Sequence, residues 1–292
     1  MLLRQFLQPP APAPNEGAEE RLSPAPHQRA RGELRLSWKR RGEATVLDTL
    51  RQDGCLKARF PRTEAPAWPG AVTLNSAGGV AGGDRLSTTI TAGPGTSATV
   101  ASQAAERIYR ALPGATSIID TTLHVAEAAA LEWLPQETIL FDRCALHRRL
   151  DIHLAADAWF LGVESLVFGR TAMNEQVHDA RIHDRITIRR AGHLVLHDAI
   201  RLDGPVAALL ARPAIGRGAC AVATIVHAAA DAPRHLDALR AALAPYDAGA
   251  SALDGLLIAR IVAPTGAALR GAVATGLNIL RGGRTLPRVW LC

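Results

Sequence analysis

The amino-acid sequence predicts a β-dominated protein with two α-helices in its C-terminal third. Two observations carry this prediction. Apolar and polar residues alternate with a period of two in many short runs, which is typical of half-buried strands. Apolar residues recur at clear helical spacing only in the last third of the chain. Short strands at close spacing indicate an all-β body, and the helical segments indicate a small α/β addition to it.

The strand signals begin at residues 34–39, where apolar and polar residues alternate. The runs ATVLDTL and CLKARF follow, and the Asp53-Gly54 dipeptide between them predicts a hairpin turn. The strand-like runs that come next are DRLSTTITA, SATVASQ, ERIYRAL, SIIDTTLHVA, ALEWL, ALHRRLDIHL, AWFLGVESLVFG, RIHDRITIRR and HLVLHDAI. We expect residues 29–292 to form a single β-rich domain.

Two later segments predict helices. Residues 234–243, RHLDALRAAL, place their leucines on one face, and Pro245 stops the helix. Residues 267–280 show the same spacing and end before a Gly-Gly pair. The runs GACAVATIVHA and GLLIARIVA predict further strands beside these helices. At the other end of the chain, residues 1–28 are rich in Pro, Ala and Glu and lack periodicity, so they predict a flexible tail.

Composition argues against a nucleic-acid-binding protein. The chain of 292 residues is 48% hydrophobic and 21% charged, as in ordinary globular proteins. Its net charge of +6 comes almost wholly from arginines that are scattered between acids, and only 4% of its residues are aromatic. Nucleic-acid binders usually cluster basic residues with interleaved aromatics. A basic surface of the present kind suits an acidic protein partner.

Neither a membrane span nor export is predicted. No run approaches the roughly 20 apolar residues that a membrane helix needs, and the apolar N-terminal start is too short for a signal sequence. The four cysteines lie far apart and form no C-x-x-C pair, which predicts free thiols rather than a zinc or redox site. We therefore expect a cytoplasmic protein, and no role is assigned to Cys292.

The segment NSAGGVAGGDRL, residues 75–86, contains the motif glycines Gly78, Gly79, Gly82 and Gly83. Its spacing satisfies the first half of a phosphate-binding loop. Such a loop would continue with Lys and then Ser or Thr, whereas this chain has Asp84 and Arg85, and a carboxylate there would repel phosphate. The glycines are better explained by close backbone packing or positive φ, which would fix the direction of Asp84.

Candidate catalytic groups are sparse. The G-x-S-x-G pentapeptide of serine hydrolases is absent. His193 and His197 lie four residues apart in a strand-like run and would share a face, so a metal-dependent hydrolase using His193, His197 and Asp198 is an alternative. Glu164 and Asp198 are a conceivable carboxylate pair for glycoside hydrolysis, although the sequence does not fix their separation.

Three motifs, in this order and spacing, resemble the UreD (also UreH) family of urease accessory proteins. They are GGVAGGD at 78–84, ERIYR at 106–110 and LEWLPQE at 131–137. Similar stretches are FGR at 168–170 with Glu175, RLDG at 201–204 and PRVW at 287–290. The likeness spans roughly residues 32–292. The chain departs from the family at Asn174, where Gly is usual, and at Ser76-Ala77, where a Pro-Pro pair is common.

The resemblance implies a non-catalytic maturation factor. Members of this family have an all-β, open helical or sandwich-like wound body with two helices. They bind apo-urease together with UreF and the GTPase UreG, and nickel is thought to pass through the UreD body toward urease. A conduit must hold nickel weakly, since thiolates and clustered imidazoles would trap it. Isolated carboxylates, carbonyls and water would suit such transit, with no permanently bound cofactor and no fixed metal site.

The resemblance also suggests residues for this conduit. Asp84 is carried over from the glycine motif, and Asp198 and Glu175 are further candidate acids. The alternative for Asp84 is a cap on the turn before the next strand, and for the other two acids it is an ion pair with arginine. The remaining matched positions, interpreted as packing residues or partner contacts, are Glu106, Tyr109, Arg110, Glu132, Trp133, Pro135, Arg288 and Trp290.

Overall fold

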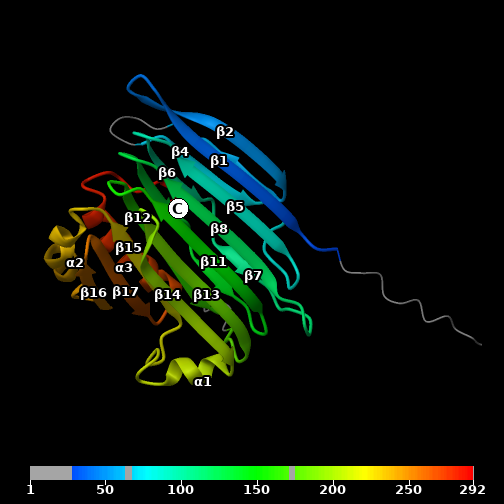
Figure 1. Ribbon diagram of the computed structural model, residues 1–292. Coiled ribbons are helices and arrows are strands. Elements are labelled where there is room, and N and C mark those ends of the chain that lie inside the picture. The colour runs from blue at the N-terminus through cyan, green and yellow to red at the C-terminus, as the bar shows by residue number, and fades with distance from the viewer. Residues whose placement is uncertain (1–27, 63–67, 171–174, 292) are drawn as a thin grey trace, which may run out of the picture.

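A computed structural model describes residues 28–62, 68–170 and 175–291 of the protein. The predicted tail, apart from residue 28, lies outside the described residues, as do Asn174 and Cys292. Two mixed β-sheets make up most of the described chain (Figure 1).

Sheet A has the strand order β14-β13-β11-β8-β5-β1-β2. Its inner five strands are parallel to one another, and β2 and β14 pair antiparallel at the two edges. The bounds of its strands are β1 (Arg31–Arg41), β2 (Ala44–Gly54), β5 (Arg85–Ala92), β8 (Ser117–Val125), β11 (Ala145–Leu154), β13 (Ala180–Arg190) and β14 (His193–Gly204).

Sheet B has the strand order β16-β17-β15-β12-β9-β6-β4-β3, and two short strands lie off this path, β10 beside β12 and β7 beside β10. The bounds are β3 (Leu56–Arg59), β4 (Gly70–Asn75), β6 (Ser97–Ser102), β7 (Glu106–Ile108), β9 (Ala130–Leu134), β10 (Thr138–Leu140), β12 (Trp159–Phe168), β15 (Ala221–Ala228), β16 (Asp247–Leu253) and β17 (Leu256–Ala263).

The chain winds between the two sheets. From β5 to β13 it adds strands to sheet A and sheet B in turn, and the neighbouring strands laid down in this way are parallel. Parallel strands need a crossover connection, and here the crossover is itself a strand of the facing sheet. The prediction of a wound, β-dominated body is confirmed.

The middle strands of sheet B, such as β12 and β15, are buried on both faces. Along β15, Val226 packs into the apolar cluster between the two sheets. The preceding residue, Ile225, points to the opposite face and packs into a second cluster beneath the helices. These helices are α2 (Leu236–Leu243), which follows the 3₁₀ turn η2 (Ala232–His235), and α3 (Gly266–Leu280). Both predicted helices are confirmed, with residues 234–235 in the 3₁₀ turn instead of the helix. The short helix α1 (Val206–Ala211) is not predicted by the sequence.

The predicted hairpin at Asp53-Gly54 is wrong. Residues 44–54 form the continuous strand β2 of sheet A, whereas β3 belongs to sheet B. Gly54 has φ +56°, and a Cβ there would lie 1.9 Å from the Arg31 carbonyl oxygen. The glycine therefore marks the point where the chain leaves one sheet for the other. The hairpin in this region joins β1 to β2 through the turn at residues 42–43.

Candidate functional site

The glycine motif forms the loop between β4 and β5. Gly78, Gly79 and Gly83 have φ values of +76°, +146° and +94°, in the region that favours glycine. A Cβ on Gly79 would lie 2.3 Å from the ring of Tyr109, and the Tyr109 hydroxyl donates a 2.9 Å hydrogen bond to the Gly78 carbonyl. The loop thus uses glycine both for its backbone turns and for a close approach to the segment after β7.

Asp84 is 4% exposed and is held by the backbone. One carboxylate oxygen accepts a 2.8 Å hydrogen bond from the Ala30 amide, and the other accepts a 2.7 Å bond from the Ala81 amide. The Asp84 amide in turn donates to the Ala81 carbonyl at 3.0 Å. The side chain therefore closes the glycine loop and ties it to the residues that lead into β1.

The other two candidate acids lie elsewhere and have arginine partners. Both carboxylate oxygens of Asp198, on the edge strand β14, are 2.7 Å from Nη2 of Arg260. Glu175 accepts a 2.6 Å hydrogen bond from Arg170. Three strands separate β14 from β5 in sheet A, or roughly 19 Å at the usual spacing between strands, so the structure does not bring Asp84 and Asp198 together. A role of the three acids in metal transfer stays a prediction.

A cavity of about 300 Å³ with both polar and apolar lining residues lies between the two sheets. It borders the glycine motif at Gly78 and Gly79. Burial raises the pKa of the Glu106 carboxyl, although hydrogen bonds from the Arg107 amide and the Asn75 side chain oppose the rise. The polar side chains that line the cavity are Thr73, Asn75, Thr88, Ser102, Gln103, Glu106, Arg107, Thr121, Trp133, Gln136, Thr138, Arg148 and Glu164.

One wall of this cavity carries a buried charge network that spans both sheets. Arg148 of β11 binds Asp184 of β13 through two hydrogen bonds of 2.8 and 2.7 Å, and it reaches across to Glu164 of β12 at 2.8 Å. The indole of Trp133 donates to Glu164 at 2.7 Å. Burial raises the pKa of Glu164, and Asp184 adds to the rise, while Arg148 and Trp133 oppose it. Two carboxyls thus share one guanidinium.

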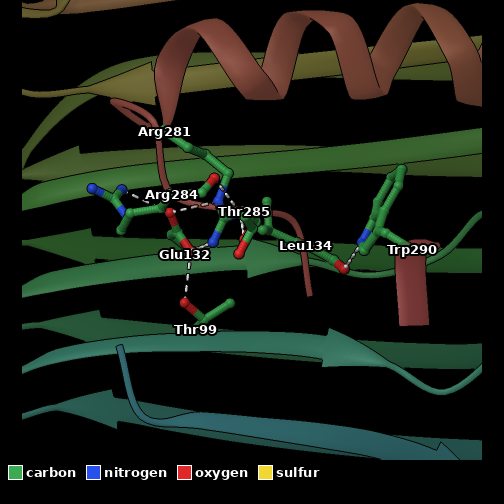
Figure 2. Close-up of polar contacts among 7 residues, drawn as sticks. All are labelled: Thr99, Glu132, Leu134, Arg281, Arg284, Thr285 and Trp290. Atoms are coloured by element: carbon green, nitrogen blue, oxygen red, sulfur yellow. Dashed lines mark hydrogen bonds and ion pairs between the residues drawn. The ribbon is translucent and has the colours of Figure 1, made fainter. Parts of the chain in front are cut away.

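A second buried network holds the C-terminal segment against sheet B (Figure 2). Glu132 of β9 is fully buried and accepts two hydrogen bonds from Arg281, of 2.9 and 2.8 Å. It also accepts bonds from Arg284 at 2.8 Å and from Thr99 at 2.6 Å. Burial alone would raise the pKa of Glu132, but the bonds and charge of Arg281, with Thr99 and Arg284, outweigh it and lower that pKa.

We call residues 281–291 the C-terminal strap. Beyond the Glu132 network, the Trp290 indole donates to the Leu134 carbonyl at 3.0 Å, and the Gln136 amide donates to the Val289 carbonyl at 2.8 Å (Figure 2 shows the first). Residues 288–290 form the 3₁₀ turn η3. Trp290 is 7% exposed and packs into the core of its own chain. The LEWLPQE motif is therefore the surface that receives the strap.

The alternative hydrolase site does not form. A bulge in β14 places His193 opposite Arg190 and His197 opposite Thr187. Because cross-strand partners share a face and successive residues alternate, the two histidines lie on opposite faces of sheet A. Asp198 follows His197 directly and so points to the other side from it. Within the described ranges no group of three or more His, Cys, Asp or Glu side chains is placed to hold a metal ion.

Comparison with known proteins identifies the family. A family model described as UreD urease accessory protein matches residues 30–291. The chain belongs to the UreD family. It is 47% identical over 256 residues to the urease accessory protein UreD of Methylobacterium sp. (strain 4-46), covering 85% of this chain and 90% of the relative. It is 45% identical over 258 residues to UreD of Ruegeria pomeroyi, covering 88% and 99%.

A UreD-family chain is a urease accessory protein and not an enzyme. Sequence reasoning named Glu132 and Trp133 of its motifs but not Arg281, the partner of Glu132. It named Glu164 only as a possible glycosidase acid and not as the partner of Trp133, and it missed Arg148 altogether. The sequence does contain a partial signal for Arg148, because this charged residue stands at a position where the alternation in ALHRRLDIHL predicts burial. In the described part of this UreD-family chain, no helix is long and apolar enough to cross a membrane.

Proposed function

We propose that this chain acts in the cytoplasm, where it binds apo-urease together with UreF and UreG and assists nickel delivery to the urease active site. Membership of the UreD family gives it a role in the urease maturation complex. The net charge of +6 supports binding to acidic protein surfaces. The observation that carries the nickel proposal is the cavity between the sheets, which is lined by Glu106 and Glu164 and adjoins the glycine motif.

The donor set of the cavity suits an ion in transit. Its acids are Glu106 and Glu164, accompanied by hydroxyls, amides and the arginines Arg107 and Arg148, while its lining contains neither cysteine nor histidine. Oxygen donors bind nickel more weakly than thiolate or clustered imidazole, and passage requires sites that release the ion. Glu106, at the glycine-motif end, would receive the ion, and Glu164 would lie on its way along the inter-sheet space.

Within this proposal Asp84 acts through the loop that it closes. Both of its oxygens are occupied by amides, so its contribution to the conduit is to fix Gly78 and Gly79 at the border of the cavity. Asp198 and Glu175 are proposed as acids outside this cavity that become available only if their arginine partners move.

Partner binding is tested by coexpression. We expect the chain to be recovered with UreF, UreG and apo-urease in a complex of fixed stoichiometry, measured by affinity capture of urease and mass determination. The control is the same capture experiment with an unrelated acidic protein of similar size as bait in place of urease. Recovery that is equal for both baits, or no recovery at all, would contradict the proposal.

The conduit is tested by comparing two acids. Glu106→Gln keeps the shape of a lining residue, removes its charge and loses one of its two accepted hydrogen bonds. We therefore expect a stability loss of about 1 kcal/mol, intact complex formation and reduced nickel content of urease. Asp84→Ala leaves two partly buried amides without acceptors, which costs about 1–3 kcal/mol in all, so both stability and nickel content should fall. The measurements are metal analysis of the purified urease and denaturant unfolding of each variant. Normal nickel content with Glu106→Gln would remove the cavity from the proposal.

A further inference from the structure

Two pairs of histidines lie side by side on sheet A. His147 of β11 and His183 of β13 are cross-strand partners, with ring centroids 4.9 Å apart and ring planes at 10°. His153 of β11 and His124 of β8 are also cross-strand partners, with centroids 5.0 Å apart and planes at 19°. The outer face of sheet A, on which they lie, is the one that points away from sheet B, because the alternate residues of β11 are buried between the sheets.

The surroundings leave these imidazoles able to act as ligands. Burial lowers the pKa of His147, and the neighbouring His183 adds to this. Burial also lowers the pKa of His124, again with a contribution from the other ring of its pair. Both effects favour neutral rings, which have a free nitrogen lone pair, at neutral pH.

The charged residues between the two pairs are largely neutralised by each other. Arg149 binds Asp120 through two hydrogen bonds of 2.6 and 2.8 Å, and Arg185 lies 3.5 Å from Asp151. These two ion pairs occupy the rows of the outer face that separate the histidine pairs. Beside the pairs themselves, Arg201 is the cross-strand neighbour of His183, and Arg189 is that of His153. Both arginines are exposed, so water and salt screen their charge from a cation bound to the imidazoles.

We propose that each histidine pair is a surface site for one first-row divalent cation, with Ni²⁺ and Cu²⁺ as the best fit. Imidazole is a preferred ligand of both ions, and copper binds such sites more tightly than nickel. Bonds from imidazole nitrogen to first-row ions are about 2.0–2.1 Å long. Two rings about 5 Å apart can converge on one ion by rotating about their side-chain bonds, with water completing the coordination. Two protein ligands give an exchangeable site.

This inference goes beyond the proposed function, because the sites lie outside the inter-sheet cavity and need no partner protein. Its test therefore uses the full-length chain alone, freed of any polyhistidine tag, and does not depend on urease activation. His147 and His153 are six residues apart on one strand, which corresponds to about 20 Å at 3.3 Å per residue. Two Cu²⁺ ions, one at each pair, should be separated by about that distance.

Dipolar electron paramagnetic resonance of the copper-loaded chain should show a Cu²⁺–Cu²⁺ distance of about 20 Å. His183→Ala or His153→Ala should each abolish this distance, and calorimetry with Ni²⁺ should show the loss of one of two sites. His197→Ala is the matched control, since His197 lies on the same face but opposite Thr187. Unchanged melting temperatures show that the variants fold. The inference is overturned if the distance is absent in the wild-type chain, or if it persists in either pair variant.

Discussion

Glu132→Gln is expected to destabilise the chain by about 3–5 kcal/mol, because it leaves the buried guanidinium of Arg281 without its carboxylate. Arg281 is 4% exposed at its side chain and Glu132 is 0% exposed, so water cannot replace the lost partner. Denaturant unfolding at neutral pH measures the loss. Glu127→Gln removes a charge from an exposed position of the same region and should change stability by less than about 0.5 kcal/mol.

The same substitution should release the C-terminal strap before the rest of the chain unfolds. Glu132 anchors both Arg281 and Arg284, which lie at the start of the strap, and Trp290 is the next strong contact. Glu132→Gln should therefore accelerate amide hydrogen exchange in residues 281–291 more than in sheet A. Equal protection of the strap in the variant and the wild-type chain would show that Trp290 and the Gln136 contact hold it unaided.

The pH dependence of this stabilisation has a definite sign. The pKa of Glu132 is lower in the folded state than its ordinary value of about 4.3. Its contribution to stability is therefore complete above that ordinary value and is lost as the pH falls through the folded-state pKa. The difference in unfolding free energy between Glu132→Gln and the wild-type chain should accordingly stay constant from neutral pH down to about pH 5 and shrink below about pH 4.

The sequence predicted those parts of the fold that depend on local pattern. Strands such as β11, in which inward and outward positions alternate, and helices with leucines on one face were located correctly. β16, with the sequence DAGASAL, was missed because its small residues give little alternation. The turn at Asp53-Gly54 was misassigned, since a positive-φ glycine serves a change of sheet as well as it serves a hairpin.

The candidate site depended on contacts that no local pattern contains. Glu132 and Arg281 are 149 residues apart in the chain, and the Ala30 amide is 54 residues from Asp84. Motif resemblance identified one member of each contact but not the member that it binds. The glycine motif predicts that the Asp84 side chain has a fixed direction. That this carboxylate binds the backbone amides of Ala30 and Ala81 follows only from the wound fold.

Arg148→Met should have an effect as large as that of Glu132→Gln, about 3–5 kcal/mol at neutral pH, because it leaves two buried carboxyls facing each other. The matched control is Arg149→Met, the adjacent arginine on the outer face, whose side chain is 40% exposed and pairs with Asp120. It should cost less than about 1 kcal/mol. Denaturant unfolding of both variants gives the comparison, and equal losses would contradict a buried role for Arg148.

The pH dependence of Arg148→Met should differ from that of Glu132→Gln. Burial already raises the pKa of Glu164, and the variant removes the arginine that opposes this rise. The folded-state pKa of Glu164 therefore rises further, and its carboxyl takes up a proton on folding at a higher pH than in the wild-type chain. The penalty is then fully present above the raised folded-state pKa and declines as the pH falls below it. The destabilisation should therefore shrink as the pH falls from the raised pKa of Glu164 toward the ordinary carboxyl value, a range in which that of Glu132→Gln stays constant. Adding Glu164→Gln should recover part of the lost stability, because the second substitution removes the carboxyl that the missing arginine left unpaired. A double variant less stable than Arg148→Met alone would show that Glu164 is stabilised by Trp133 without help from Arg148.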